Sequence, residues 1–307
     1  MRATLATLAV VGLTWGVPFG PWALAEESPP LAPTHANVSY GPHERNVLDF
    51  WQAEGEGPRP VLVFIHGGGW TAGDKQQNAD RILPFLARGV SYAAINYRFT
   101  TQAPLPAPVH DAARAIQFLR TQAEPWRLDP DRIALTGGSA GACTSMWLLL
   151  HDDLADPSSA DPLLRQSTRV AAAAVSAGQT ALDPKVIEPW IGPKVLDHRM
   201  IPLSVGEPTL ADALARYEAH QADYREFSPI NHVDGGDPPL MMLYDRSLHL
   251  PADDASHGIH HPMFGLKLKE KSDRAGHECH LLVTSKRGVD AVHPAAMAFL
   301  LEKLRAE

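Results

Sequence analysis

The chain has 307 residues, of which 45% are hydrophobic and 20% charged, and its formal net charge is −8 at pH 7. This composition is typical of a globular protein with a full hydrophobic core, and it excludes a wholly disordered chain. The negative charge argues against a protein that binds nucleic acid by neutralising phosphates. The two cysteines, Cys143 and Cys279, are too few for a disulfide scaffold, so we expect both to be small core residues.

We expect the first 25 residues to be a secretory signal peptide. The segment MRATLATLAVVGLTWGVPFGPWALA has a positive charge at Arg2, an apolar run, and a small-x-small pattern that ends at Ala25, where cleavage is expected. A transmembrane anchor is the alternative, but glycines and prolines interrupt the run and no positive cluster follows it. The mature protein is therefore expected to be secreted or periplasmic, without a membrane span.

After this segment, the chain alternates between two kinds of pattern. Residues 26–35 form a proline-rich lead-in, and two short extended pieces, 36–41 and 46–52, follow it. Beyond them, apolar runs typical of strands buried on both faces alternate with segments that repeat apolar residues at helical spacing. Strands are predicted at 60–66, 90–99, 131–137, 167–176, 238–244 and 277–284, and helices at 75–89, 108–122, 140–154, 262–276 and 294–307. This order predicts an α/β fold with a mostly parallel central sheet and helices on both faces.

The alternation fails at about residues 177–232, which contain prolines and short helical fragments but no strong strand. Ligands of parallel sheets collect outside the carboxyl ends of the strands. We therefore interpret this segment as a small helical cap inserted over that edge. The predicted domain spans residues 36–305 and includes the cap.

A serine surrounded by glycines is the first candidate for chemistry. Residues 137–141 read GGSAG, which fits G-x-S-x-G, and they lie between a predicted strand and a predicted helix. Such a serine occupies a strained turn, where larger flanking side chains would collide with the neighbouring strand and helix. The following helix N-terminus favours negative charge at the reacting atom. Ser139 is therefore predicted to be a nucleophile.

A glycine loop is the second candidate. Residues 66–70 read HGGGW and follow the first buried strand, so they are expected at the same sheet edge as Ser139. Backbone N–H groups of such a loop can point at an oxyanion without obstruction. A phosphate-binding loop is the alternative, but the Gly-Lys-Ser/Thr ending is absent. His66 is expected to orient the loop through hydrogen bonds.

With these two motifs the sequence resembles the α/β-hydrolase fold, in the esterase and lipase group that combines an HGGG loop with a GGSAG elbow. This group includes hormone-sensitive-lipase-like carboxylesterases and feruloyl- or acetyl-esterase-like enzymes. The resemblance implies Ser139 as nucleophile and the backbone N–H groups of Gly68, Gly69 and Ala140 as oxyanion hole. It also implies the chain order serine, acid, histidine, and neither a metal nor an organic cofactor.

The acid is where this sequence departs from the family. There the acid follows the strand predicted here at 238–244 by a few residues, but position 248 is leucine. An acid must reach the second nitrogen of the histidine to hold its tautomer. The candidates in the long loop are Asp254, which we prefer, Asp253 and Asp245, and the absence of any acid stays open.

The predicted general base is His293, which stands between the last strand and the last helix, directly before Pro294. The family usually has a glycine before this histidine, whereas Val292 precedes it here. His257 is the alternative base.

The loop around His257 also allows a metal site. Imidazole and carboxylate groups could supply ligands to zinc or another transition metal. The candidates are His249, Asp253, Asp254, His257, His260 and His261. No His-x-x-x-His on a clear helix supports such a site, so we favour polar residues near the mouth of the pocket.

The expected function is a serine hydrolase that cleaves carboxylic esters through an acyl-enzyme. Export favours acetyl or feruloyl esters of polysaccharide fragments, so the expected partner is a small-molecule or oligosaccharide ester. Two alternatives stay open: a peptidase or lipase on the same fold, and a catalytically degenerate binding protein. The sequence leaves the oligomeric state open.

Overall fold

The computed structural model describes residues 31–284 and 288–305. The predicted signal peptide with its cleavage site at Ala25 lies outside the described residues, as does the first half of the proline-rich lead-in. Within the described ranges, no helix is long and apolar enough to cross a membrane.

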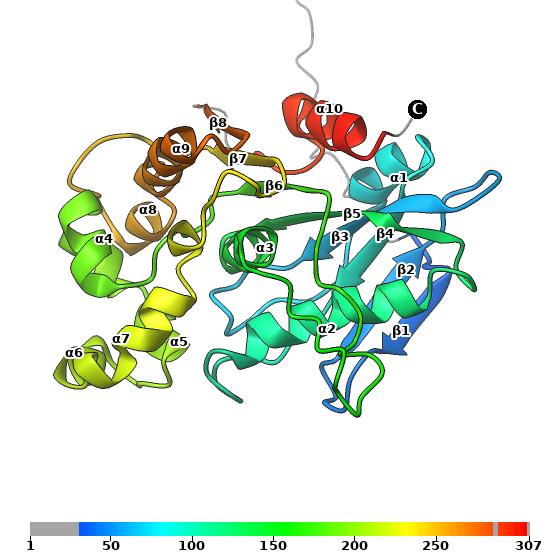
Figure 1. Ribbon diagram of the computed structural model, residues 1–307. Helices are drawn as coiled ribbons and strands as arrows, with labels where there is room; N and C mark the ends of the chain where they lie inside the picture. The colour runs from blue at the N-terminus through cyan, green and yellow to red at the C-terminus, as the bar shows by residue number, and fades with distance from the viewer. Residues whose placement is uncertain (1–30, 285–287, 306–307) are drawn as a thin grey trace, which may run out of the picture.

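An eight-stranded sheet forms the centre of the molecule, in the order β1-β2-β4-β3-β5-β6-β7-β8 (Figure 1). The strands are β1 (His35–Ser39), β2 (Val47–Trp51), β3 (Arg59–Ile65), β4 (Ser91–Ile95), β5 (Leu128–Gly138), β6 (Ala172–Ser176), β7 (Leu240–Tyr244) and β8 (Cys279–Val283). Strand β2 pairs antiparallel with β1 and β4, and all other pairs are parallel. The predicted mostly parallel α/β fold is confirmed.

Helices cover both faces of the sheet, which explains why its strands read as continuous apolar runs. Successive residues of β3 show the two faces: Val61 and Val63 belong to one buried cluster, and Leu62 to the other. The first cluster includes residues of α2 (Ala107–Thr121), α3 (Ala140–Leu150) and α9 (Met263–Ala275). The second includes residues of α1 (Ala79–Leu86) and α10 (Pro294–Lys303).

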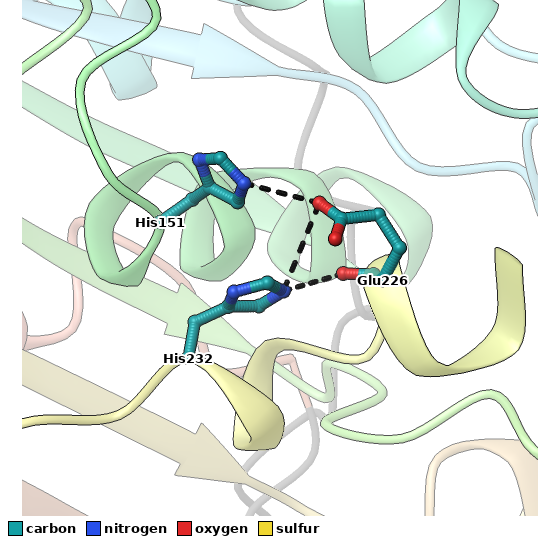
Figure 2. Close-up of side chains that lie close together, drawn as sticks. All are labelled: His151, Glu226 and His232. Carbon is teal, nitrogen blue, oxygen red and sulfur yellow. Dashed lines mark hydrogen bonds and ion pairs between the residues drawn. The ribbon is translucent and has the colours of Figure 1, made fainter. Parts of the chain in front are cut away.

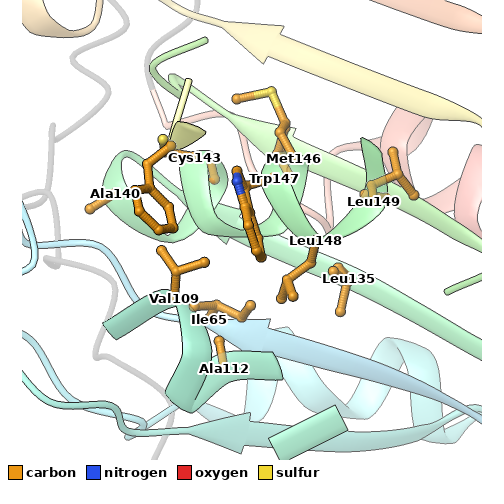
Figure 3. Packing of buried hydrophobic residues seen from close by; sticks show 14 of the residues in the cluster. Ile65, Val109, Ala112, Leu135, Ala140, Cys143, Met146, Trp147, Leu148 and Leu149 are labelled. Carbon is orange, nitrogen blue, oxygen red and sulfur yellow. The ribbon is translucent and has the colours of Figure 1, made fainter. Parts of the chain in front are cut away.

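Helix α3 begins directly after the predicted nucleophile and is buried along its whole length. All of its residues are buried, and it lacks the polar stripe of a surface helix. Figure 3 shows its side chains Cys143, Met146 and Trp147 packed with Ile65 of β3 and Val109 of α2. This packing fixes the start of α3, where Ser139 lies. Cys143 and Cys279 are both free and buried, as predicted.

The segment between β6 and β7 is built of short helices, and all of it is described. These are α4 (Pro184–Ile191), η1 (Pro193–Asp197), α5 (Met200–Ser204), α6 (Leu210–Ala215), α7 (Tyr217–Glu226) and η2 (Pro229–Asn231). Its aromatic side chains Tyr217 and Tyr224 are buried in the core. One further short helix, α8 (Ala255–Ile259), lies between β7 and α9 and was not expected from the sequence.

Candidate active site

The turn at Ser139 has the strained geometry of a nucleophile elbow. Ser139 stands between β5 and α3 with φ 53° and ψ −123°, in the left-handed region that side chains rarely occupy. The neighbouring glycines leave room for the turn. A Cβ at Gly137 would lie 2.5 Å from the carbonyl oxygen of Ile65, and one at Gly141 would lie 2.0 Å from the same oxygen. Small residues are therefore required on both sides of Ser139.

The hydrogen-bond partner of the serine is His260. The Oγ of Ser139 lies 2.9 Å from the Nε2 of His260, the residue that ends α8. The other ring nitrogen, Nδ1, lies 2.9 Å from the carbonyl oxygen of Ser256. Since a carbonyl oxygen only accepts hydrogen bonds, Nδ1 carries the proton and Nε2 offers its lone pair to the serine hydroxyl. This arrangement is that of a serine with a positioned general base.

The surroundings of His260 keep its imidazole neutral. Burial lowers the pKa of His260 and is the largest influence, and the positive charge of Arg246 lowers it further. The hydrogen bond to Ser256 and the negative charge of Asp245 oppose this by raising the pKa. The net direction is downward, so the base is unprotonated at neutral pH.

His260 therefore holds the position that the sequence predicted for His293. The Nδ1 of His293 instead accepts a hydrogen bond from the N–H of Ala295 at 3.3 Å and caps α10. The alternative base, His257, has its Nε2 2.9 Å from the carbonyl oxygen of Ser247. The difference arises because α8, a helix of five residues, carries the loop histidine to the serine.

The three candidate acids take other positions. Asp254 caps α8, since its Oδ1 accepts a hydrogen bond from the N–H of His257 at 2.7 Å. Asp253 faces the Nδ1 of His257 at 3.2 Å. Asp245 accepts a hydrogen bond from the N–H of Gly288 at 2.7 Å. Within the described part of the chain, the partner of His260 Nδ1 is thus a main-chain carbonyl and not a carboxylate.

The glycine loop lies against the elbow, as its position after β3 predicts. A Cβ at Gly67 would come within 2.7 Å of the carbonyl oxygen of Gly138, so only glycine allows this close approach. Gly68 and Gly69 follow with φ 98° and 60°. Ala140 is the first residue of α3, and the first N–H groups of a helix have no partner within it. These three backbone N–H groups are the proposed oxyanion donors.

Buried aromatic residues support the loop from below. His66 stacks on Tyr97 with ring centres 4.1 Å apart, and its Nδ1 lies 2.8 Å from the carbonyl oxygen of Gly67. Burial lowers the pKa of His66 to about 4, so this side chain stays neutral. Trp70 is fully buried and donates from Nε1 to the Oγ1 of Thr144 on α3 at 3.0 Å. The loop and the elbow are therefore held by one packed unit.

A cavity of about 360 Å³ opens beside the serine and the histidine. Both Ser139 and His260 line it, together with the charged residues Arg81, Asp245, Arg246 and Asp290 and with apolar side chains that include Phe64, Tyr92, Val289 and Val292. This volume lies at the small end of the range for ligand pockets. The cavity is thus small, and both apolar and charged side chains line it.

The segment between β6 and β7 reaches this site. The ring centre of His198 lies 6.3 Å from that of His260, and burial lowers the pKa of His198. The neighbouring Arg199 donates from Nε to the Oγ1 of Thr71, just after the glycine loop, at 3.1 Å. The helical segment therefore touches both halves of the candidate site.

Sequence comparison places these motifs within a known family. The BD-FAE family model matches residues 48–249, a range that includes the glycine loop and Ser139 and ends before His260. The probable carboxylic ester hydrolase LipM of Mycobacterium tuberculosis is 31% identical over 69% of this chain and 47% of its own length. Esterase LipQ of the same organism is 30% identical over 68% of this chain and 48% of its own. The chain thus spans about half the length of these curated relatives.

Solved structures agree with the fold. A truncated form of a carbohydrate esterase from gut microbiota has a TM-score of 0.70 and 21% identity, and the match covers 88% of this chain and 96% of that chain. An acetyl ester-xyloside bifunctional hydrolase from Caldicellulosiruptor lactoaceticus has a TM-score of 0.62 and 20% identity, with 84% of each chain covered. The central sheet and its helices are therefore shared with known esterases.

Proposed function

The chain belongs to the BD-FAE family, and on this premise we propose that it is a carboxylic ester hydrolase that works through an acyl-enzyme on Ser139. The observation that carries the proposal is the 2.9 Å contact between the Oγ of Ser139 and the Nε2 of His260 in a strained elbow. The similarity to LipM, a probable carboxylic ester hydrolase, and to esterase LipQ supports the same reaction class.

In the first step, the Oγ of Ser139 attacks the ester carbonyl carbon while the Nε2 of His260 takes the hydroxyl proton. The carbonyl oxygen becomes an oxyanion, which accepts hydrogen bonds from the N–H groups of Gly68, Gly69 and Ala140. The bond to the alcohol then breaks, and His260 returns the proton to the leaving oxygen. Water hydrolyses the acyl-enzyme by the same route.

The Ser256 carbonyl has the positioning task that a carboxylate has in a triad. It accepts the hydrogen bond of His260 Nδ1 and so holds the reactive tautomer and the plane of the ring. A neutral carbonyl stabilises the imidazolium less than a carboxylate does. Asp245 supplies negative charge from the cavity wall, because its field raises the pKa of His260.

We propose short acyl esters of carbohydrates as the substrate class. The cavity of about 360 Å³ has room for a small acyl group beside Ser139. Its charged residues, Arg81, Asp245, Arg246 and Asp290, offer hydrogen bonds to sugar hydroxyls. The two structural neighbours, a carbohydrate esterase and an acetyl ester-xyloside bifunctional hydrolase, support the same class.

A second candidate function is a binding protein that retains the elbow without turning over esters. The observation that favours it is the carbonyl, in place of a carboxylate, at His260 Nδ1.

The first test is the intact mass after incubation with a fluorophosphonate, which adds one covalent group to an activated serine. We expect one adduct on the wild type, none on Ser139→Ala, and strongly slowed labelling of His260→Gln.

A substrate panel follows the labelling. Acetylated xylo-oligosaccharides, a feruloyl ester, a long-chain acyl ester and a peptide amide separate the carbohydrate esterase from the lipase and the peptidase. We expect the acetylated oligosaccharide to have the highest kcat/KM. Folded wild type that neither gains an adduct nor turns over any of the four would leave the binding protein as the conclusion.

Secretion to the periplasm or medium stays a prediction from residues 1–25. It is supported by the Ala-x-Ala pattern that ends at Ala25. Mass spectrometry of the exported protein tests it, and the expected N-terminal residue is Glu26.

A further inference from the structure

Two histidines and a glutamate meet at the end of α3 that is remote from Ser139 (Figure 2). His151 directly follows α3, Glu226 ends α7, and His232 directly follows η2. The Nε2 of His151 lies 3.0 Å from Glu226 Oε1, and the Nε2 of His232 lies 4.0 Å from the same oxygen. One ligand atom from each of the three residues lies within 4.8 Å of the others.

The tautomer of His151 leaves a lone pair facing a negative charge. Its Nδ1 lies 2.8 Å from the carbonyl oxygen of Asp152, so this nitrogen donates and carries the proton. In the neutral ring, Nε2 then has only a lone pair, and it points at the Glu226 carboxylate 3.0 Å away. Two electron-rich atoms at this distance require a cation to bridge them, either a proton or a metal ion. Metal-bound histidines commonly have this hydrogen bond from the second nitrogen to a carbonyl.

His232 can join the same ion without leaving the part-buried carbonyl of Glu226 unpaired. Its Nε2 donates to this backbone oxygen at 2.5 Å, so metal binding through Nε2 would release this contact and move the proton to Nδ1. That oxygen also accepts a hydrogen bond from the Nε1 of Trp147 at 2.9 Å. The indole of Trp147 further stacks on His151 with ring centres 4.2 Å apart and meets His232 edge-on. Trp147 thus holds both imidazoles next to the carboxylate.

The spacing suits a tetrahedral ion. Bonds of about 2.0–2.1 Å at tetrahedral angles place ligand atoms about 3.3 Å apart. The distances from Glu226 Oε1 to the Nε2 atoms of His151 and His232, 3.0 and 4.0 Å, bracket this value. The side chains are 20%, 43% and 19% exposed for His151, Glu226 and His232. Water therefore has access to the fourth position, which completes an open two-histidine, one-carboxylate site.

We propose that His151, Glu226 and His232 bind one divalent transition-metal ion, with zinc as the expected ion. Two imidazoles and a carboxylate suit zinc among the common metals. Helix α3 spans 11 residues, a length of about 16 Å, and it separates Ser139 at its N-cap from His151 at its C-cap. The ion would therefore lie apart from the ester site and would join the end of α3 to the α7–η2 segment. The proposal is independent of ester hydrolysis.

The test is zinc binding by the full chain after removal of metal with a chelator. Equilibrium dialysis followed by elemental analysis counts the bound zinc, and Co²⁺ added in place of zinc reports tetrahedral geometry through its visible absorption. The chain has 15 histidines, so weak sites elsewhere are expected and the comparison is between variants. We expect wild type to bind one equivalent more than His151→Gln and His232→Gln, and to show tetrahedral Co²⁺ bands that both variants lack.

The matched control is His280→Gln. His280 Nε2 lies 3.1 Å from Glu278 Oε1 in an exposed pair, and among the described residues this pair belongs to no three-ligand group. We expect this variant to keep the extra equivalent of zinc. Because a bound ion stabilises the folded chain, we also expect zinc to raise the Tm of this variant and of the wild type equally. Equal zinc content in wild type and His151→Gln, or the same loss in His280→Gln, would overturn the proposal. If circular dichroism shows that a histidine variant is unfolded, Glu226→Gln decides in the same way.

Discussion

At the scale of single residues, we expect substitutions of His260 and His293 to have different effects on activity. Removing the general base costs about 10²–10⁴ in rate, so His260→Gln is expected to lower kcat/KM by this factor. His293→Gln should leave kcat/KM within a few-fold of the wild type, because His293 bonds to its own helix. Steady-state kinetics on a chromogenic acetate ester measures both, and equal losses in the two variants would contradict the assignment.

We expect His260 also to determine how kcat/KM depends on pH. Only unprotonated His260 can take the serine proton, so kcat/KM should rise with pH through an apparent pKa below the usual histidine value of about 6.5. Asp245 raises the pKa of His260, and Asp245→Asn should therefore move the midpoint to still lower pH. A midpoint that moves upward in this variant would show that the carboxylate does not act on the base.

At the scale of elements, α8 decides the site, and Asp254 is its N-cap. Asp254→Ala removes the cap, so α8 is expected to fray and kcat to fall several-fold with little change in KM. Asp254→Ser retains a capping oxygen and should restore kcat. If Asp254 were instead the acid of a triad, serine would rescue nothing, so equal losses of kcat in the two variants would favour the triad.

How much of the site the sequence predicts depends on how local each requirement is. The elbow and the glycine loop need particular backbone angles and close approaches, which only glycine and other small residues allow at Gly137, Gly141 and Gly67. These needs appear directly in the sequence. The strands of the sheet were equally visible, because both faces are buried and the apolar runs are continuous.

The position of the general base depends on contacts between distant segments, so the sequence pattern did not predict His260. Helix α8 has only five residues, too few for an apolar period. A signal was present in Gly258, where a Cβ would lie 2.7 Å from the Cα of Val195, so the helix packs directly on η1. That contact between distant segments aims His260 at Ser139, and no local pattern encodes it. The remaining local signs are Asp254, the N-cap of α8, and Pro262, the N-cap of α9.

At the scale of the whole molecule, the segment between β6 and β7 is hydrogen-bonded to the rest of the fold at both ends of α3. Arg199 donates to Thr71 beside the glycine loop, and Trp147 of α3 donates to the carbonyl of Glu226. The first contact lies at the catalytic edge and the second at the far end of α3. Because α3 is buried throughout, these two contacts hold the helical segment against both ends of the helix that carries Ser139 at its N-cap.

The free energy of unfolding should depend on pH through His66, which packs beneath the glycine loop. Burial lowers the pKa of His66 to about 4 in the folded chain, against 6.5 in the unfolded chain. Between these values the unfolded state binds more protons, so the free energy of unfolding is full above pH 6.5 and decreases as the pH falls to 4. A shift of this size corresponds to about 3 kcal/mol.

Other buried histidines titrate in the same range, so the measurement is a difference between two proteins. Urea unfolding of wild type and His66→Asn at pH 7 and pH 4.5 gives the two changes in free energy. The amide of asparagine can still donate to the Gly67 carbonyl but does not titrate, so the variant should lose less stability on acidification. Because His66 stacks on Tyr97 beneath the glycine loop, its protonation is also expected to loosen the oxyanion donors. Identical acid sensitivity in the two proteins would show that His66 titrates alike in the folded and unfolded states, which would contradict the prediction.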